Sequence, residues 1–232
     1  MTTQQILDIM NPKKFIRIAG VLLLAVSICA IGDFYHIHTR AIDYSTVTRE
    51  SIAPADTDTF YFFPPPEKQY VSPVDPLEIQ LVRQLKIIFP FFITVFLGMA
   101  VIYALLSKVL STSIEKRLST SHTQFSESIE PGCFFMALYF LSGFGNAEPY
   151  FLFIVFTIIF IGRLFTTYDR VFVLILSLIV GVSGAFYEGA ICLVPYRNAL
   201  LFDAPIWLGP LYMNGVFAFR AFYRYAVYDE NQ

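Results

Sequence analysis

Six side chains that could bind a ligand or move a proton flank two apolar stretches: His122, Gln124, Glu127 and Glu130 before one, Arg163 and Tyr168 after the other. Positions 124, 127 and 130 are three apart, so in a helix their side chains share one face. An acid and an arginine at one depth of a membrane tend to pair, because an isolated charge is costly there. The spacing therefore predicts an ion pair, which serves either a ligand site or the structure alone.

Six apolar stretches would have to position these residues: 15–31, 86–110, 131–144, 150–165, 171–194 and 204–223. A helix needs about 20 mostly apolar residues to cross a bilayer, and four of the stretches reach or approach that length. Charged residues make up only 15% of the chain, against ~25% in a soluble domain. The sequence predicts an all-α, polytopic integral membrane protein, a helical bundle of six transmembrane helices. We expect spans two to five to form a four-helix core.

Basic residues gather beside alternate ends of these stretches: Lys13, Lys14, Arg17, Lys108, Lys116, Arg117, Arg163, Arg170, Arg220 and Arg224. The positive-inside rule then places the N- and C-termini in the cytoplasm, with Arg220 and Arg224 at lipid head groups. We expect an N-terminal anchor helix (1–34), an extracytoplasmic Pro/aromatic-rich segment (35–84) and a membrane bundle of five spans (85–232). The first span resembles a signal peptide, but its length and poor cleavage pattern favour a retained helix.

Several classes of site find no support in the sequence. The net charge is −2 and there is no basic run, so we expect no nucleic-acid partner. The cysteines, Cys29, Cys133 and Cys192, lie inside apolar stretches, which predicts neither disulfides nor a metal site. His36 and His38 lack a third ligand at a suitable spacing, so we predict surface histidines and no metal. No catalytic residue can be assigned from a motif.

Residues 114–118 are followed by residues 122–131, which carry a histidine, an amide, an acid and a proline in that order. Residues 156–163 end on an arginine. These segments resemble the second and third helices of the membrane-associated proteins in eicosanoid and glutathione metabolism. The resemblance covers about residues 84–195 and implies a homo-trimer that binds glutathione at the cytoplasmic side. It implies that Gln124, Glu127, Arg163 and Tyr168 contact that cofactor. Thr123 stands where the family usually has arginine, and the catalytic arginine of its fourth helix has no match.

Two functions follow as hypotheses. In the first, the protein binds or modifies an amphipathic, lipid-like ligand at the cytoplasmic leaflet, in a glutathione-linked manner; an enzyme of this kind would be a glutathione-dependent transferase or isomerase. In the second, it is a non-enzymatic membrane subunit or scaffold. Its outer segment, with an aromatic run at 60–63 and prolines at 64–66, would then bind a partner protein within a membrane complex.

Overall fold

The computed structural model describes residues 12–39, 41–42, 77–110, 122–144, 148–190, 196, 199–201 and 204–228. These residues are almost entirely helical, which confirms the all-α prediction. Isolated bridges join Ile42 to Tyr196 and Leu201 to Ala204. The aromatic and proline run at 60–66, proposed to bind a partner, lies outside the described residues.

The helices in chain order are α2 (Pro12–His38), α3 (Leu77–Arg83), a π-helix (Gln84–Ile88), α4 (Phe89–Val109), α6 (Phe125–Phe144), α7 (Pro149–Phe165), α8 (Arg170–Ala190) and α9 (Leu208–Val227). Helix α2 therefore continues past residue 34 to His38, and the second helical stretch begins at Leu77, inside the segment expected to lie outside the membrane. Both helices are longer than their most apolar parts.

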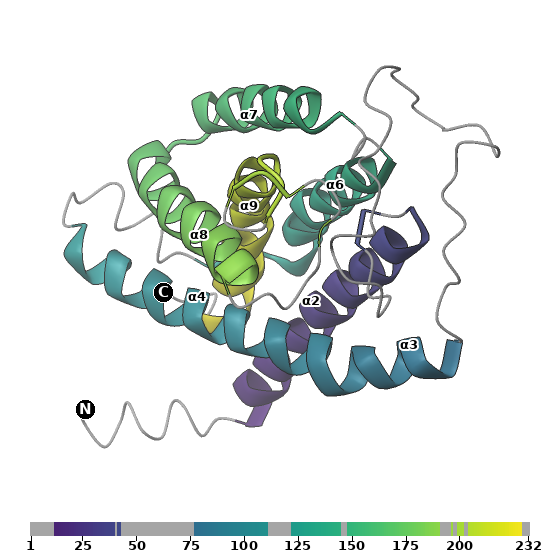
Figure 1. Cartoon of the computed structure of the whole chain (residues 1–232). Coiled ribbons are helices and arrows are strands. Elements are labelled where there is room, and N and C mark those ends of the chain that lie inside the picture. The colour runs from purple at the N-terminus through teal and green to yellow at the C-terminus, as the bar shows by residue number, and fades with distance from the viewer. Residues whose placement is uncertain are drawn as a thin grey trace, which may run out of the picture.

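Helix α9 occupies the centre of the bundle and packs against α2, α6, α7 and α8 (Figure 1). Its buried side chains run along its whole length, from Leu208 to Ala226. The expectation of a core built from spans two to five is therefore wrong, because the sixth apolar stretch forms the axis. The same helix is the least apolar of the long helices. A helix covered by other helices can carry more polar side chains, provided that they find partners within the bundle.

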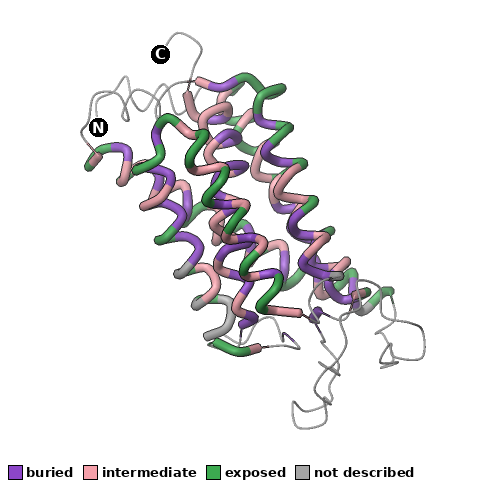
Figure 2. Tube along the Cα trace, turned by 90° about the horizontal axis from the view of Figure 1, so that it is seen from above, coloured by how far each residue is buried: buried purple, intermediate pink, exposed green. Residues whose placement is uncertain are grey.

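The surrounding helices have exposed residues along their length, drawn as green segments (Figure 2), and many of these residues are apolar. On α4 the stripe consists of residues four apart, Ile93, Leu97, Val101 and Leu105, the last three being 54–58% exposed. On α7, Ile158 is 63% exposed. Two described helical stretches, Pro12–His38 and Gln80–Val109, are long and apolar enough to cross a membrane, and Pro149–Phe165 and Arg170–Ala185 are shorter apolar helices. Exposed apolar stripes such as these are typical of surfaces that meet lipid or another protein.

The π-helix before α4 has a local cause in the sequence. Pro90 has no backbone N–H, and in a regular α-helix its ring would clash with the carbonyl of Lys86. The wider π-turn avoids this clash, and the N–H of Phe89 bonds the carbonyl oxygen of Gln84 instead. The turn also directs the Gln84 side chain inward, where its Nε2 donates to Asp33 Oδ2 at 2.5 Å. The helix thereby joins α2 through buried polar groups.

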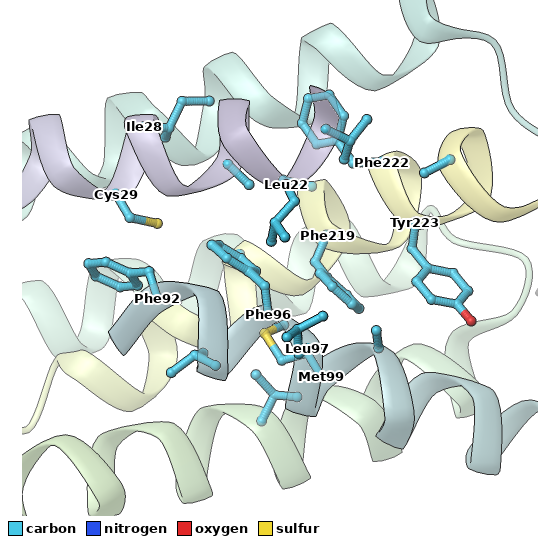
Figure 3. A pocket seen from close by; sticks show the side chains of 18 of the residues that line it. Leu22, Ile28, Cys29, Phe92, Phe96, Leu97, Met99, Phe219, Phe222 and Tyr223 are labelled. Atoms are coloured by element: carbon cyan, nitrogen blue, oxygen red, sulfur yellow. The ribbon is translucent and has the colours of Figure 1, made fainter. Parts of the chain in front are cut away.

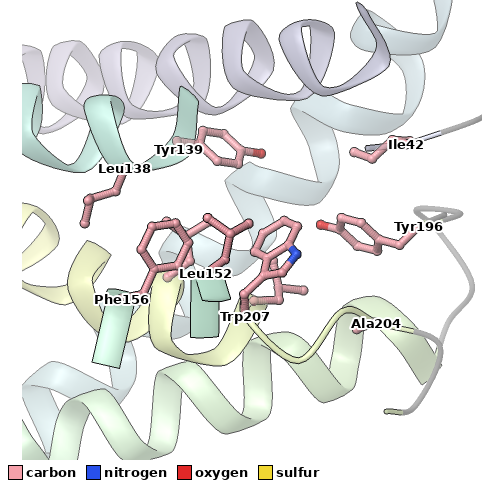
Figure 4. Packing of buried hydrophobic residues seen from close by; sticks show 10 residues of the cluster. Ile42, Leu138, Tyr139, Leu152, Phe156, Tyr196, Ala204 and Trp207 are labelled. Atoms are coloured by element: carbon pink, nitrogen blue, oxygen red, sulfur yellow. The ribbon is translucent and has the colours of Figure 1, made fainter. Parts of the chain in front are cut away.

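The two ends of the bundle are built differently. We call one the Trp207 end, because the fully buried Trp207 packs there edge-on against Tyr196 and Phe156 (Figure 4). We call the other the Tyr228 end, where Arg17 at the start of α2 reaches the main chain of Ala226 and Tyr228 at the end of α9. The start of α2 and the end of α9 therefore lie together. The chain must then run from one end of the bundle to the other an even number of times between these two points.

Candidate functional site

An apolar cavity of about 190 Å³ opens between α2, α4 and α9. Aromatic and aliphatic side chains line it almost completely, among them Leu22, Phe96, Phe219 and Phe222 (Figure 3). Small residues make room for it, including Ala100 on α4 and Ala218 on α9. A cavity with such walls offers no hydrogen bonds along its length, so it suits a hydrocarbon chain rather than a polar molecule.

Different residues line the two ends of the cavity. Cys29 and Phe92 lie at one end and Tyr223 at the other, with the tyrosine hydroxyl pointing away from the apolar walls (Figure 3). Beyond Tyr223 the lining continues to Ala226 and Val227, in the last turn of α9. The Tyr223 end of the cavity therefore opens onto the Tyr228 end of the bundle.

Arg17 lies at the Tyr228 end but is not among the residues that line the cavity. Its Nε donates to the carbonyl oxygen of Ala226 at 3.2 Å and its Nη2 to that of Tyr228 at 3.3 Å. Its guanidinium also lies 5.6 Å from the centre of the Tyr225 ring. The last carbonyls of a helix carry partial negative charge, and a cation that bonds them stabilises the helix end. Arg17 thus holds a positive charge at the Tyr228 end, one residue before the lining residue Ile18.

Tyr228 connects several helices at this end. Its main-chain oxygen also bonds His122 Nδ1 at 2.8 Å, just before α6. Its side chain hydrogen-bonds Ser107 on α4, and burial raises the pKa of its hydroxyl. Arg224 adds a further link, because its Nη2 donates to the carbonyl oxygen of His122 at 3.4 Å.

A buried ion pair lies beside this network. Arg220 donates to Asp169 Oδ2 from Nη2 at 2.6 Å and from Nε at 2.9 Å. Asp169 is 1% exposed and the Arg220 side chain 16% exposed. Arg220 therefore turns toward the protein and not, as predicted, toward lipid head groups. Two hydrogen bonds to one carboxylate offset the cost of removing both charges from water.

Arg163 pairs with an acid as predicted, but the partner is Glu130, at 3.9 Å, and not Glu127, which was proposed to act with Arg163. The Arg163 guanidinium lies between two aromatic rings, 4.4 Å from the centre of Phe134 and 4.5 Å from that of Phe217. Its Nη1 is buried and makes no hydrogen bond to any described residue. Stacking on both faces holds the guanidinium more firmly than the single contact to the exposed Glu130 does.

The other predicted ligand-binding residues are dispersed. Glu127 accepts a hydrogen bond from the backbone N–H of Gln124 at 3.3 Å and so caps its own helix. Both side chains are exposed, near the start of α6. Tyr168, in the turn between α7 and α8, is 88% exposed. Of the four residues proposed to hold glutathione, only Arg163 is partly enclosed by aromatic side chains.

His36 belongs to a second polar cluster, at the Trp207 end. It is fully buried, so the prediction of a surface histidine is wrong for His36 and right for His38, which is exposed. His36 Nε2 lies 2.8 Å from Ser142 Oγ and 3.1 Å from the carbonyl oxygen of Tyr139. A carbonyl only accepts, so Nε2 carries the proton. Among the described residues no group of three His, Cys, Asp or Glu side chains could hold a metal ion.

No family model, no curated protein and no solved structure matches this chain. The resemblance to the membrane-associated proteins in eicosanoid and glutathione metabolism remains a prediction from the sequence. The cavity and the network around Tyr228 were not predicted. Small residues interspersed with aromatic ones in α4 and α9 were their sequence signal, and this pattern is also typical of ordinary helix packing.

Proposed function

We propose that this protein is a six-span membrane protein that binds an amphipathic, lipid-like ligand in the cavity between α2, α4 and α9. Exposed apolar stripes on α4 and α7 support the membrane location. The proximity of Arg17 to Tyr228 supports an even number of spans. With the basic residues gathered at the Tyr228 end, the positive-inside rule puts this end, and both termini, in the cytoplasm.

One observation carries the ligand proposal: the cavity is apolar along its length, and one of its ends, at Tyr223, lies next to the Tyr228 end of the bundle, where Arg17 is held. An amphipathic molecule has the same division between chain and head. Its chain would lie against Phe96 and Phe219, and its head would reach the Tyr228 end, at the cytoplasmic leaflet. Burial of the chain in a dry, apolar cavity would supply most of the binding free energy.

The test is to fill the cavity. Ala100→Phe places a ring where the chain would lie, whereas Ala137→Phe, on an exposed position of α6 outside the cavity lining, adds the same ring without blocking it. We expect the Ala100 variant to lose co-purified lipid, measured by native mass spectrometry in detergent, and the Ala137 variant to retain it. Equal lipid retention by the two variants, or wild-type protein that retains no lipid, would refute the proposal.

The glutathione-linked form of this function is a separate proposal, supported by the sequence resemblance and by the aromatic enclosure of Arg163. If it holds, the purified protein binds glutathione, and Arg163→Ala or Glu127→Gln abolishes binding. Isothermal calorimetry at millimolar glutathione tests this directly. An absence of heat in the wild type would remove the glutathione proposal and leave the lipid proposal standing.

A further inference from the structure

We infer that the chain of the ligand in this cavity is isoprenoid, that is, branched by methyl groups and unsaturated at regular intervals. The inference rests on the proposed function and adds the chemical class of the chain. It follows from the unequal walls of the cavity and from their length.

Four aromatic rings follow one another along the wall that α4 and α9 form (Figure 3). The ring centres are 6.4 Å apart from Phe92 to Phe96 and from Phe96 to Phe219, and 5.8 Å apart from Phe219 to Tyr223. We call this row the aromatic ladder. Eight of the 25 lining residues are Phe or Tyr, about twice the 17% share of aromatic residues in the whole chain. The cavity is therefore richer in rings than the bundle around it.

The wall formed by α2 is aliphatic instead. Its lining residues are Ile18, Val21, Leu22, Ala25, Ile28 and Cys29. A chain between the two walls meets rings on one side and aliphatic groups on the other. Double bonds present flat π-surfaces that pack against aromatic rings with a gain beyond the burial of area, whereas a saturated chain gains from area alone. The aromatic ladder therefore favours an unsaturated chain.

The walls recede at intervals beside the rings. Four lining residues are alanines, whose side chains are single methyl groups: Ala25 on α2, Ala100 on α4, and Ala218 and Ala226 on α9. Ala218 lies directly before Phe219 of the aromatic ladder. Methyl branches on a chain fill indentations of this size, and the close packing that results favours binding. An unbranched chain would leave them unfilled.

The length of the cavity limits the length of the chain. Its lining follows α2 from Ile18 to Cys29, which is roughly 16 Å at about 1.5 Å per residue. This is about half of the ~30 Å thickness of the hydrocarbon core. The cavity therefore suits a chain of a few isoprene units, which reaches across one leaflet, and not a long polyprenol.

The experiment compares alcohols, so that the head group is the same in each. Delipidated full-length protein is offered an equimolar mixture of geranylgeraniol and hexadecanol, which has the same main-chain length without branches or double bonds. Retention is measured by native mass spectrometry. We expect about a tenfold preference for geranylgeraniol. Equal retention of the two by the wild type overturns the isoprenoid assignment.

Two variants test the aromatic ladder. Phe96→Leu combined with Phe219→Leu keeps the wall apolar but removes two rings, so the preference for geranylgeraniol should largely disappear. Phe165→Leu removes a ring that is 71% exposed on α7, outside the lining, and should keep the preference. A double variant that prefers geranylgeraniol as strongly as the wild type does would show that the rings do not select the ligand.

Further alcohols, offered to the wild type alone, separate the two features of the chain. The fully hydrogenated analogue of geranylgeraniol keeps the branches, and linolenyl alcohol keeps double bonds without branches; each should be retained less than geranylgeraniol. If linolenyl alcohol is retained as well, the chain is a straight unsaturated one and the isoprenoid assignment is wrong. If the protein retains co-purified lipid but none of these alcohols, the assignment is also wrong, while the lipid-binding function stands. A protein that retains neither overturns both.

Discussion

The guanidinium of Arg17 donates a hydrogen bond to the main-chain oxygen of Tyr228 at 3.3 Å, although 211 residues separate them in the sequence. The other end of α2 is held as well, because His36 bonds Ser142 and Tyr139 on α6. A helix tied at both ends and lining the cavity is an integral member of the bundle.

Gly32 should tolerate no side chain. A Cβ at this position would overlap the ring of Tyr139, which is itself buried and cannot move aside. We expect Gly32→Ala to lower the free energy of unfolding by about 1–3 kcal/mol, measured by thermal or denaturant unfolding in detergent. Gly20, in the same helix, has open space around its Cβ position. Gly20→Ala is therefore the matched control and should be neutral or slightly stabilising; equal destabilisation by both changes would argue against the α2–α6 contact.

His36 should contribute to stability much more than His38. Replacing His36 by alanine removes its contacts to Ser142 Oγ and the Tyr139 carbonyl and leaves a cavity, at a cost of about 2–4 kcal/mol. His38→Ala changes an exposed side chain two residues away and should cost less than about 0.5 kcal/mol. Unfolding midpoints of the two variants in detergent provide the comparison. Similar midpoints would show that the His36–Ser142 contact does not hold α2 against α6.

The Asp169–Arg220 pair should show strong coupling. Asp169→Asn leaves the largely buried Arg220 without its carboxylate, and we expect a loss of about 2 kcal/mol in the free energy of unfolding. Adding Arg220→Met removes the uncompensated charge and should restore most of the loss. A double-mutant cycle measured by unfolding in detergent tests this. Strictly additive effects of the two substitutions would mean that the pair contributes no coupling.

Labelling of single cysteines should place the two ends of the bundle on opposite sides of the membrane. In a background without Cys29, Cys133 and Cys192, cysteines at the exposed positions Gln124 and Tyr168 should react with a membrane-impermeant reagent only after the cytoplasmic face is opened. A cysteine at His38, exposed at the Trp207 end, should react from the outer face. We expect this result because basic residues gather at the Tyr228 end, and the positive-inside rule places such an end in the cytoplasm. Reaction of positions 124 and 38 from the same side would rule out the six-span arrangement.

The amino-acid sequence alone predicted that the chain is helical and where its apolar helices lie, because apolar runs of this length are much longer than a buried strand and favour a helix. It also predicted the pairing of Arg163 with an acid at the start of α6, since Glu130 and Arg163 flank neighbouring apolar stretches. Only the tertiary structure decided that α9 is the central helix, that His36 is buried and that Arg17 reaches Tyr228. Lipid tails are as apolar as a protein core, so hydrophobicity does not tell which face of a membrane helix meets protein. That choice depends on shape and on polar contacts between residues far apart in sequence.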